Sequence, residues 1–182
     1  MRVIAGSARR LQLISPKGMD TRPTGDKIKE TLFNILAPEL YDVDFLDLFA
    51  GSGGIGIEAL SRGAGSCTFI EKDREAIRCI KKNLEMTHFT DRASVYAGDV
   101  MNGIYNLTGK YGIVFMDPPY ASQYAAQVLN ALKILDITDE DTLFIAECGK
   151  ETDMSFADAA GYDIIRIKEY KNSKHVFMKH RI

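Results

Sequence analysis

The chain has 182 residues, 46% of them hydrophobic, and a formal net charge of −2, which is enough sequence for one domain with a full core. No apolar run approaches the roughly 20 residues of a membrane-spanning helix, and no apolar segment follows the N-terminal arginines, so we expect a cytoplasmic protein without a membrane segment or signal peptide. Three cysteines without a C-x-x-C pair and three scattered histidines predict reduced thiols and no metal site.

Basic residues gather at the two ends of the chain. Residues 1–30 carry seven basic and three acidic side chains, and residues 166–182 carry six basic side chains and one acidic. The ends are therefore +4 and +5, which leaves −11 for the middle of a chain whose total is −2. This distribution is typical of a domain that presents one positive face to a polyanion, and it slightly favours nucleic acid as a partner.

Short strand-like runs alternate with helical patterns along the chain. The expected strands are residues 44–49, 66–71, 93–97, 113–116, 142–146, 162–167 and 175–178. Five helices are expected. The first runs from the N-cap candidate Thr24 to just before Pro38, and another begins after the N-cap candidate Asp73. The other three cover residues 54–63, 122–135 and 156–160. Residues 1–13 are predicted to form a hairpin ahead of the first helix.

The alternation predicts an α/β fold with a doubly wound parallel sheet. The last two strands are joined by Asn172 and Ser173, a connection too short for a crossover, so they must pair antiparallel. We expect a Rossmann-like sheet of seven strands with the last one antiparallel, as in methyltransferases that use S-adenosylmethionine (SAM). Residues 1–20 would form a β-hairpin extension, and residues 21–182 the main domain.

The first central strand runs into a glycine-rich loop, residues 51–56, and then a helix. This order brings backbone close to a ligand at the carboxyl end of a parallel strand. The loop matches G-x-G-x-x-G, the dinucleotide fingerprint, and Glu71 follows Gly51 by 20 residues, where it could accept hydrogen bonds from ribose hydroxyls. SAM would use the same features, and Asp47 near the strand end could then meet a cationic group. The loop alone leaves NAD and SAM as alternatives.

A second motif, Asp117-Pro118-Pro119-Tyr120, follows the apolar strand at 113–116. Two consecutive prolines give a stiff turn with outward carbonyls. The Asp117 side chain and the Pro118 carbonyl can accept the two N–H bonds of a planar exocyclic base amine and aim its nitrogen at a methyl group. Tyr120 offers a face on which an extruded base can stack. A dehydrogenase has no use for this element, so the motif favours SAM over NAD.

Further contacts to a bound adenosine are predicted around the next strands. Asp99 follows the third central strand, where its carboxylate can accept from the adenine N6 amine. Phe49, Ile70 and Val100 are candidates to enclose the adenosine, although each could equally belong to the core.

Five segments occur in a characteristic order: Arg22-Pro23-Thr24, Glu30-Thr31-Leu32-Phe33-Asn34, Asp47-Leu48-Phe49-Ala50-Gly51-Ser52-Gly53, Glu71-Lys72-Asp73 and Asp117-Pro118-Pro119-Tyr120. With these segments the chain resembles, over almost its whole length, the RsmD-type 16S rRNA guanine-N2 methyltransferases of bacteria. The resemblance implies SAM as methyl donor and the exocyclic amine of a small-subunit rRNA guanine as acceptor, presented in an assembled ribosomal particle. We also expect a monomer, and no metal is required because the sulfonium of SAM is already a good leaving group.

The motifs and the resemblance together assign three groups of residues. The catalytic group is Asp117, Pro118, Pro119 and Tyr120. The cofactor group is Asp47, Phe49, Ala50, Gly51, Ser52, Gly53, Glu71, Lys72, Asp99 and Val100. The RNA-binding group is Arg9, Arg10, Arg22, Thr24 and Lys174.

Two segments depart from the family pattern. The first hairpin, around residues 5–10, lacks the usual second glycine and the aromatic-glycine pair after it, and the final turn at 170–174 lacks its glycine. Both lie on parts expected to face RNA. The alternatives are a DNA adenine-N6 methyltransferase, which usually carries a recognition insertion that this length leaves little room for, an RNA-binding module without catalysis, and, as a distant third, an NAD oxidoreductase.

Overall fold

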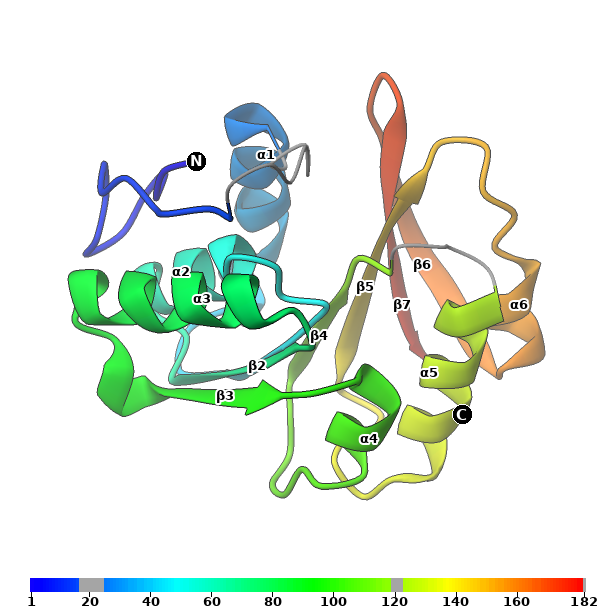
Figure 1. Ribbon diagram of the computed structural model, residues 1–182. Helices are drawn as coiled ribbons and strands as arrows, with labels where there is room; N and C mark the ends of the chain where they lie inside the picture. The colour runs from blue at the N-terminus through cyan, green and yellow to red at the C-terminus, as the bar shows by residue number, and fades with distance from the viewer. Residues whose placement is uncertain (17–24, 119–122, 182) are drawn as a thin grey trace.

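The computed structural model describes residues 1–16, 25–118 and 123–181, with six α-helices, two short 3₁₀ helices and seven strands in those ranges (Figure 1). The helices are α1 (Asp26–Leu36), η1 (Ala37–Glu39), α2 (Gly54–Ser61), α3 (Arg74–Thr87), η2 (Thr90–Arg92), α4 (Val100–Ile104), α5 (Gln123–Ile134) and α6 (Ser155–Ala159). The strands are β1 (Asp44–Leu48), β2 (Ser66–Glu71), β3 (Ala93–Ala97), β4 (Ile113–Met116), β5 (Leu143–Gly149), β6 (Tyr162–Glu169) and β7 (Ser173–His180).

The strands form one sheet in the order β3-β2-β1-β4-β5-β7-β6. Strands β1 to β5 pair parallel, and β7 inserts between β5 and β6, antiparallel to both. The predicted α/β class, with a doubly wound Rossmann-like sheet and an antiparallel last strand, is confirmed. The strand order reverses between β1 and β4, which in open α/β sheets is where ligands bind.

Helices cover both faces of the sheet (Figure 1). On one face, Phe45, Phe115 and Phe177 are buried in a cluster with residues of α1, α2 and α3. On the other, Leu46 and Phe144 are buried with residues of α4, α5 and α6. Successive strand residues point to opposite faces, so the near-continuous apolar runs of the central strands are what two covered faces require. Among the described helices, none combines the length and the apolar character needed to cross a bilayer.

The N-terminal arm, residues 1–16, forms a tight loop on α2. The two limbs of the predicted hairpin pair antiparallel through one bridge between Arg2 and Gln12, although no regular strand forms. Backbone hydrogen bonds from Val3 N to Leu11 O at 3.0 Å and from Leu13 N to Met1 O at 2.9 Å flank this bridge. The Glu58 carboxylate accepts hydrogen bonds from Ile4 N at 2.8 Å and Ala5 N at 3.0 Å. Ser61 Oγ accepts from the backbone N–H of Ala8 at 3.0 Å. The arm is therefore fastened to the helix that begins at the glycine loop.

Several predicted boundaries differ from the observed ones. The residue that caps the first helix is Gly25, and α1 begins at Asp26, whereas the N-cap candidate Thr24 lies outside the described residues. Helix α4 was not predicted, because its five residues are too few for a periodic signal. Asp73 caps α3 as predicted, its carboxylate accepting from Ala76 N at 2.8 Å.

Candidate active site

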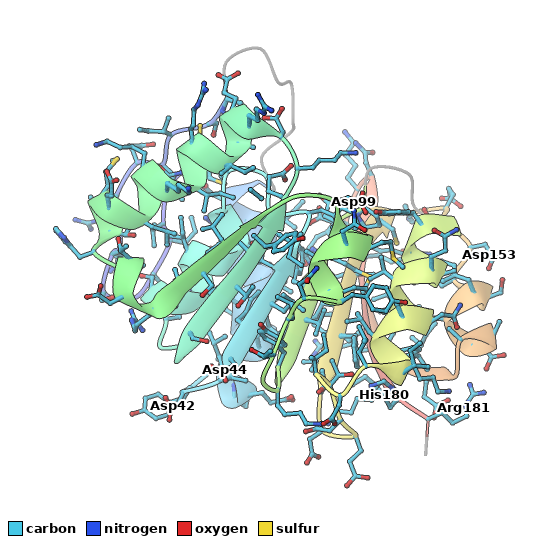
Figure 2. All side chains as sticks on the ribbon, turned by 60° about the horizontal axis from the view of Figure 1, so that its bottom comes forward. Asp42, Asp44, Asp99, Asp153, His180 and Arg181 are labelled. Carbon is cyan, nitrogen blue, oxygen red and sulfur yellow. The ribbon has the colours of Figure 1, made fainter. Side chains whose placement is uncertain are left out.

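The predicted site residues follow the carboxyl ends of neighbouring strands. Phe49 follows β1, Lys72 follows β2, Asp99 follows β3 and Asp117 follows β4. Figure 2 shows Asp99 at the edge where the strands end, away from Asp44, with which β1 begins. Parallel strands end at one edge of a sheet, so residues far apart in the sequence gather there.

The glycine loop turns sharply after β1. The Ala50 N–H donates to the Ile70 carbonyl at 3.0 Å, which holds the loop against β2. Gly51 has φ +55° and a Cβ there would meet nothing within 4 Å, so this position faces open space. Gly53 has φ +81°, but a Cβ on it would contact Phe69 and Ile80, so its role is the left-handed turn into α2 rather than an approach to a ligand.

Glu71 bonds to the glycine loop from the end of β2. Its Oε2 accepts from the Gly51 N–H at 2.8 Å, and its Oε1 accepts from the N–H groups of Lys72 at 2.9 Å and Asp73 at 2.8 Å. Three backbone donors therefore fix the carboxylate in one orientation. Glu71 was predicted to accept hydrogen bonds from ribose hydroxyls, and in the structure its partners are these backbone N–H groups.

Asp47 lies buried beneath the first turn of α2. Its Oδ2 accepts from the Gly56 N–H at 2.9 Å, at the helix end that favours negative charge. Burial raises the pKa of this carboxyl to about 7; the Gly56 hydrogen bond lowers it, and the charges of Glu71 and Asp117 raise it further. Asp47 was expected to face a cationic ligand group, and in the structure its direct partner is the helix.

Asp99 is the N-cap of α4 and also a partner of Tyr124. Its Oδ1 accepts from Met101 N at 2.9 Å, and the Tyr124 hydroxyl donates to the two carboxylate oxygens at 3.0 and 2.8 Å. The Tyr124 ring packs edge-on against Phe49, with ring centroids 5.6 Å apart. Sequence reasoning missed Tyr124, because a tyrosine in the first turn of an amphipathic helix carries no signal for a contact across the sheet edge.

The predicted catalytic segment is only partly described. Asp117 is exposed and Pro118 is buried, while Pro119 and Tyr120 lie outside the described residues, as do Arg22 and Thr24. The surrounding protein reduces the hydration of the Asp117 carboxyl although water still reaches it, and this desolvation, followed by the charge of Glu147, raises its pKa to about 7.

A hydrogen-bonded group on β5 and β7 adjoins this segment. His175 Nε2 lies 3.2 Å from Glu147 Oε2, and His175 Nδ1 lies 3.1 Å from the Tyr170 hydroxyl. The imidazole is completely buried. No motif pointed to this group, since its members are brought together by the pairing of β5 with β7.

Asn83 of α3 is a further residue that the motifs did not indicate. Its Nδ2 donates to the Ser52 carbonyl at 3.0 Å and to the Ile14 carbonyl at 2.9 Å, and its Oδ1 accepts from Ile14 N at 2.8 Å. The buried amide thereby joins the glycine loop to the N-terminal arm. A single asparagine inside a helix gives no sequence signal for such a bridge.

The predicted RNA contacts that are described lie at two separate places. Arg9 and Arg10 are exposed on the N-terminal arm, with Arg10 at φ +74°. Lys174 is the second residue of β7, and its Nζ donates to the Thr152 carbonyl at 2.8 Å. Within the described ranges, His, Cys, Asp and Glu side chains form no group that could hold a metal ion.

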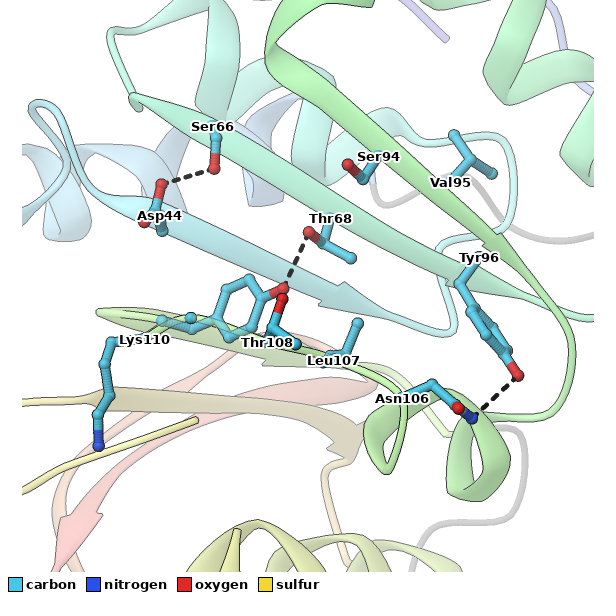
Figure 3. A pocket seen from close by; sticks show the side chains of 12 residues that line it. Asp44, Ser66, Thr68, Ser94, Val95, Tyr96, Asn106, Leu107, Thr108 and Lys110 are labelled. Carbon is cyan, nitrogen blue, oxygen red and sulfur yellow. Dashed lines mark hydrogen bonds between the residues drawn. The ribbon is translucent and has the colours of Figure 1, made fainter. Parts of the chain in front are cut away.

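A cavity of about 340 Å³ opens elsewhere, on the face of β2 and β3 near the loop before β4 (Figure 3). Hydroxyl groups line it, including Thr68, which accepts a hydrogen bond from Tyr111 at 3.1 Å, and Ser66, which donates to Asp44 at 2.6 Å. None of the predicted site residues lines this cavity. The glycine loop, Glu71 and Asp117-Pro118 all lie at the carboxyl ends of the parallel strands, so we assign the candidate site to that edge of the sheet.

Similarity to known proteins extends over the whole fold. The family model described as "Conserved hypothetical protein 95" matches residues 1–179. The chain is 41% identical over 158 residues to "Putative rRNA methyltransferase YlbH" of Bacillus subtilis, covering 85% of each chain. It is 40% identical over 133 residues to Ribosomal RNA small subunit methyltransferase D of Escherichia coli, covering 73% of this chain and 67% of that one.

A solved structure agrees with these matches. "Putative methyltransferase yhhF from Escherichia coli" superposes with a TM-score of 0.86 at 32% identity, covering 100% of this chain and 98% of that one. The strand order, the glycine loop and Asp117-Pro118 at the carboxyl edge of the sheet, and the length of the matches all agree with one family. This chain therefore belongs to the Conserved hypothetical protein 95 family, the family of the RsmD-type methyltransferases.

Proposed function

We propose that this protein transfers the methyl group of SAM to the exocyclic N2 amine of a guanine in small-subunit ribosomal RNA. One observation carries the proposal. Leu48 of β1 pairs with Met116 of β4, so the glycine loop and the Asp117-Pro118 turn leave the sheet side by side. Adjacent strands are about 4.8 Å apart, which brings a donor held by the loop within reach of an acceptor held by the turn.

The chemistry of the edge fits SAM, which carries an ammonium and a sulfonium group. Glu71 and Asp99 supply negative charge around the glycine loop, Asp47 and Asp117 add to it as they ionise near neutral pH, and the open space at Gly51 leaves room for a ligand. Glu71 would accept from the ribose hydroxyls, Asp99 from the adenine amine. The rest of the cofactor would be contacted by Phe49, Ala50, Ser52, Gly53, Lys72 and Val100. When bound, SAM would supply a methyl group carried on a sulfonium, with a neutral thioether as the leaving group.

The acceptor side uses this chain's own oxygens. The Asp117 carboxylate and the Pro118 carbonyl would accept the two N–H bonds of the guanine amine, which orients the nitrogen lone pair toward the methyl group. As the N–C bond forms, the nitrogen becomes cationic, and an ionised Asp117 stabilises that charge and takes the released proton. Pro119 and Tyr120 would complete the turn and the stacking surface for the extruded base.

Ribosomal RNA as the substrate class is supported by charge and by kinship. Both ends of the chain are basic, and the two relatives above carry rRNA methyltransferase names. We propose that the N-terminal extension (1–20) and the main domain (21–182) together face the RNA through Arg9, Arg10, Arg22, Thr24 and Lys174. We further propose a monomer that acts in the cytoplasm on an assembled small-subunit particle.

The arm can be tested by salt dependence. Replacing Arg9 and Arg10 with alanine should weaken RNA binding and flatten the plot of log affinity against log salt by about one unit of slope per lost phosphate contact. Filter binding from 50 to 200 mM salt measures this, and Arg74→Ala on the exposed start of α3 is the matched control. An unchanged slope would exclude the arm from the interface.

The function itself is tested by identifying the product. The purified protein is incubated with methyl-labelled SAM and, separately, with small ribosomal subunits, naked 16S rRNA or DNA, and the modified nucleoside is identified by mass spectrometry. Labelled N2-methylguanosine from the particle supports the proposal. Labelled N6-methyladenine in DNA would replace it with DNA methylation, and SAM binding without any product would indicate an RNA-binding module.

A further inference from the structure

Three ionisable side chains form a row across adjacent strands at the reaction edge. Met116 of β4 pairs with Ala146 of β5, so the next residues, Asp117 and Glu147, are neighbours on one face. Glu147 in turn pairs with His175 of the antiparallel strand β7. The insertion of β7 beside β5 thus adds a histidine to the line that starts at the predicted catalytic carboxylate.

The His175 imidazole at the end of this row is fixed by hydrogen bonds and by ring contacts. Both ring nitrogens are hydrogen-bonded, Nε2 to Glu147 and Nδ1 to the Tyr170 hydroxyl, and the ring is completely buried. Phe115 and Phe177 pack edge-on against it, with centroids 6.1 and 6.5 Å away. An ionised carboxylate only accepts, so in the neutral ring the hydrogen-bond network assigns the proton to Nε2 and leaves Nδ1 to accept from the tyrosine.

This arrangement acts on Asp117 through charge. Desolvation first and the Glu147 carboxylate second raise the pKa of Asp117. The other charged or titratable groups that interact with this row are Asp47 of β1, which interacts with Asp117, Cys148 of β5, which interacts with both carboxyls, and Arg166 of β6, which interacts with Tyr170. A carboxylate with a raised pKa is a stronger proton acceptor near neutral pH than an ordinary aspartate.

We propose that Glu147 and His175 are positioning residues for the reaction at Asp117: Glu147 lies beside Asp117 across adjacent strands, and His175, itself held by Tyr170, fixes the Glu147 carboxylate there by a hydrogen bond. This inference deepens the proposed function and rests on it for the activity readout. In the transfer, the amine nitrogen bonds the methyl carbon, the carbon–sulfur bond breaks with its electron pair going to sulfur, and the nitrogen's proton goes to the Asp117 carboxylate.

The first test needs no activity. The carboxyl carbon of Asp117 is titrated by NMR in the free wild-type protein and in Glu147→Gln, with Glu140→Gln, an exposed carboxyl ahead of β5, as control. Removing the neighbouring charge should lower the Asp117 midpoint by about one pH unit, and the control should leave it unchanged. Equal midpoints in wild type and Glu147→Gln would overturn the proposal.

The second test follows the acid limb of kcat/KM against pH. The limb should move to lower pH in Glu147→Gln and in His175→Phe, which keeps a ring but loses the donor to Glu147. His175→Gln, whose amide N–H can reach the carboxylate, should restore the limb of the wild type. A uniform loss of rate with the limb unmoved would reduce the pair to a structural role. If wild-type protein methylates no RNA at all, the proposed function fails, whereas the NMR titration still decides the inference.

Discussion

The two sides of the carboxyl edge differ in how their acidic groups are held. On the side of β1 to β3, the carboxylates of Asp47, Glu71 and Asp99 already accept hydrogen bonds from this chain's own backbone N–H groups. On the side of β4, Asp117 is exposed, and Glu147, whose charge acts on it, lies within hydrogen-bonding distance of His175.

This difference fits the sizes of the two proposed ligands. A small cofactor is bound best by groups that are fixed before it arrives, because little conformational freedom is then lost on binding. A macromolecule brings its own surface, so an acceptor group that stays open to solvent can be covered by the substrate. We therefore expect substitutions on the two sides to separate cofactor affinity from turnover.

The largest effect is expected on the open side. Asp117→Ala should lower kcat about 10²–10⁴-fold, because it removes both the acceptor for the amine and the group that takes its proton. SAM affinity, measured by calorimetry, should change little, since the fixed carboxylates remain. Asp117→Asn retains an acceptor oxygen without the charge, so its kcat should lie between those of wild type and Asp117→Ala. Wild-type turnover in Asp117→Ala would refute the assignment.

The converse split is expected on the fixed side. Glu71→Gln should weaken SAM binding about 10–100-fold, because charged acceptors make stronger hydrogen bonds and the loop N–H at Gly51 loses its ionised partner. At saturating SAM, kcat should be close to that of wild type. Glu85→Gln, at an exposed carboxylate in α3, serves as the control. A fall in kcat without loss of SAM affinity would contradict the assignment of Glu71 to cofactor binding.

Stability against pH tests how the buried carboxylate is held. Asp47 has a folded pKa of about 7 against an ordinary value of 3.8, so between these values the folded state binds the extra proton and stability falls as pH rises. Asp47→Asn keeps an acceptor for Gly56 without the charge. The variant's advantage in Tm should therefore grow from about pH 4 to 7 and stay constant above. A Tm difference independent of pH would mean that Asp47 is not protonated when buried.

The smallest effect is expected at Tyr124. Tyr124→Phe removes the hydroxyl that bonds both oxygens of Asp99 but leaves the cap to Met101 N and the ring contact with Phe49. One such hydrogen bond contributes about 1 kcal/mol, so SAM affinity should weaken a few-fold. Tyr105→Phe, an exposed tyrosine just beyond α4, is the control. Tighter binding in Tyr124→Phe would mean that the hydroxyl competes with the cofactor for Asp99.

Local features of the sequence were enough to predict the sheet class, the glycine turn, the cap at Asp73 and the position of Glu71 at the end of its strand. Each depends on periodicity, on a backbone conformation that glycine permits, or on the common edge at which parallel strands end. The same reasoning missed α4, whose five residues are too few for a periodic signal. It predicted the N-terminal hairpin, whose limbs pair, but not that Ile4 N and Ala5 N of this hairpin bond to Glu58 of α2.

Only the tertiary structure decided which distant side chains meet. His175 lies beside Glu147 because β7 inserts between β5 and β6, Tyr124 reaches Asp99 because α5 packs beside α4, and Asn83 joins the arm to the loop because α3 lies over both. The physical reason is that a hydrogen bond between residues tens of positions apart depends on strand order and helix docking. Neither leaves a repeating pattern in the residues that take part.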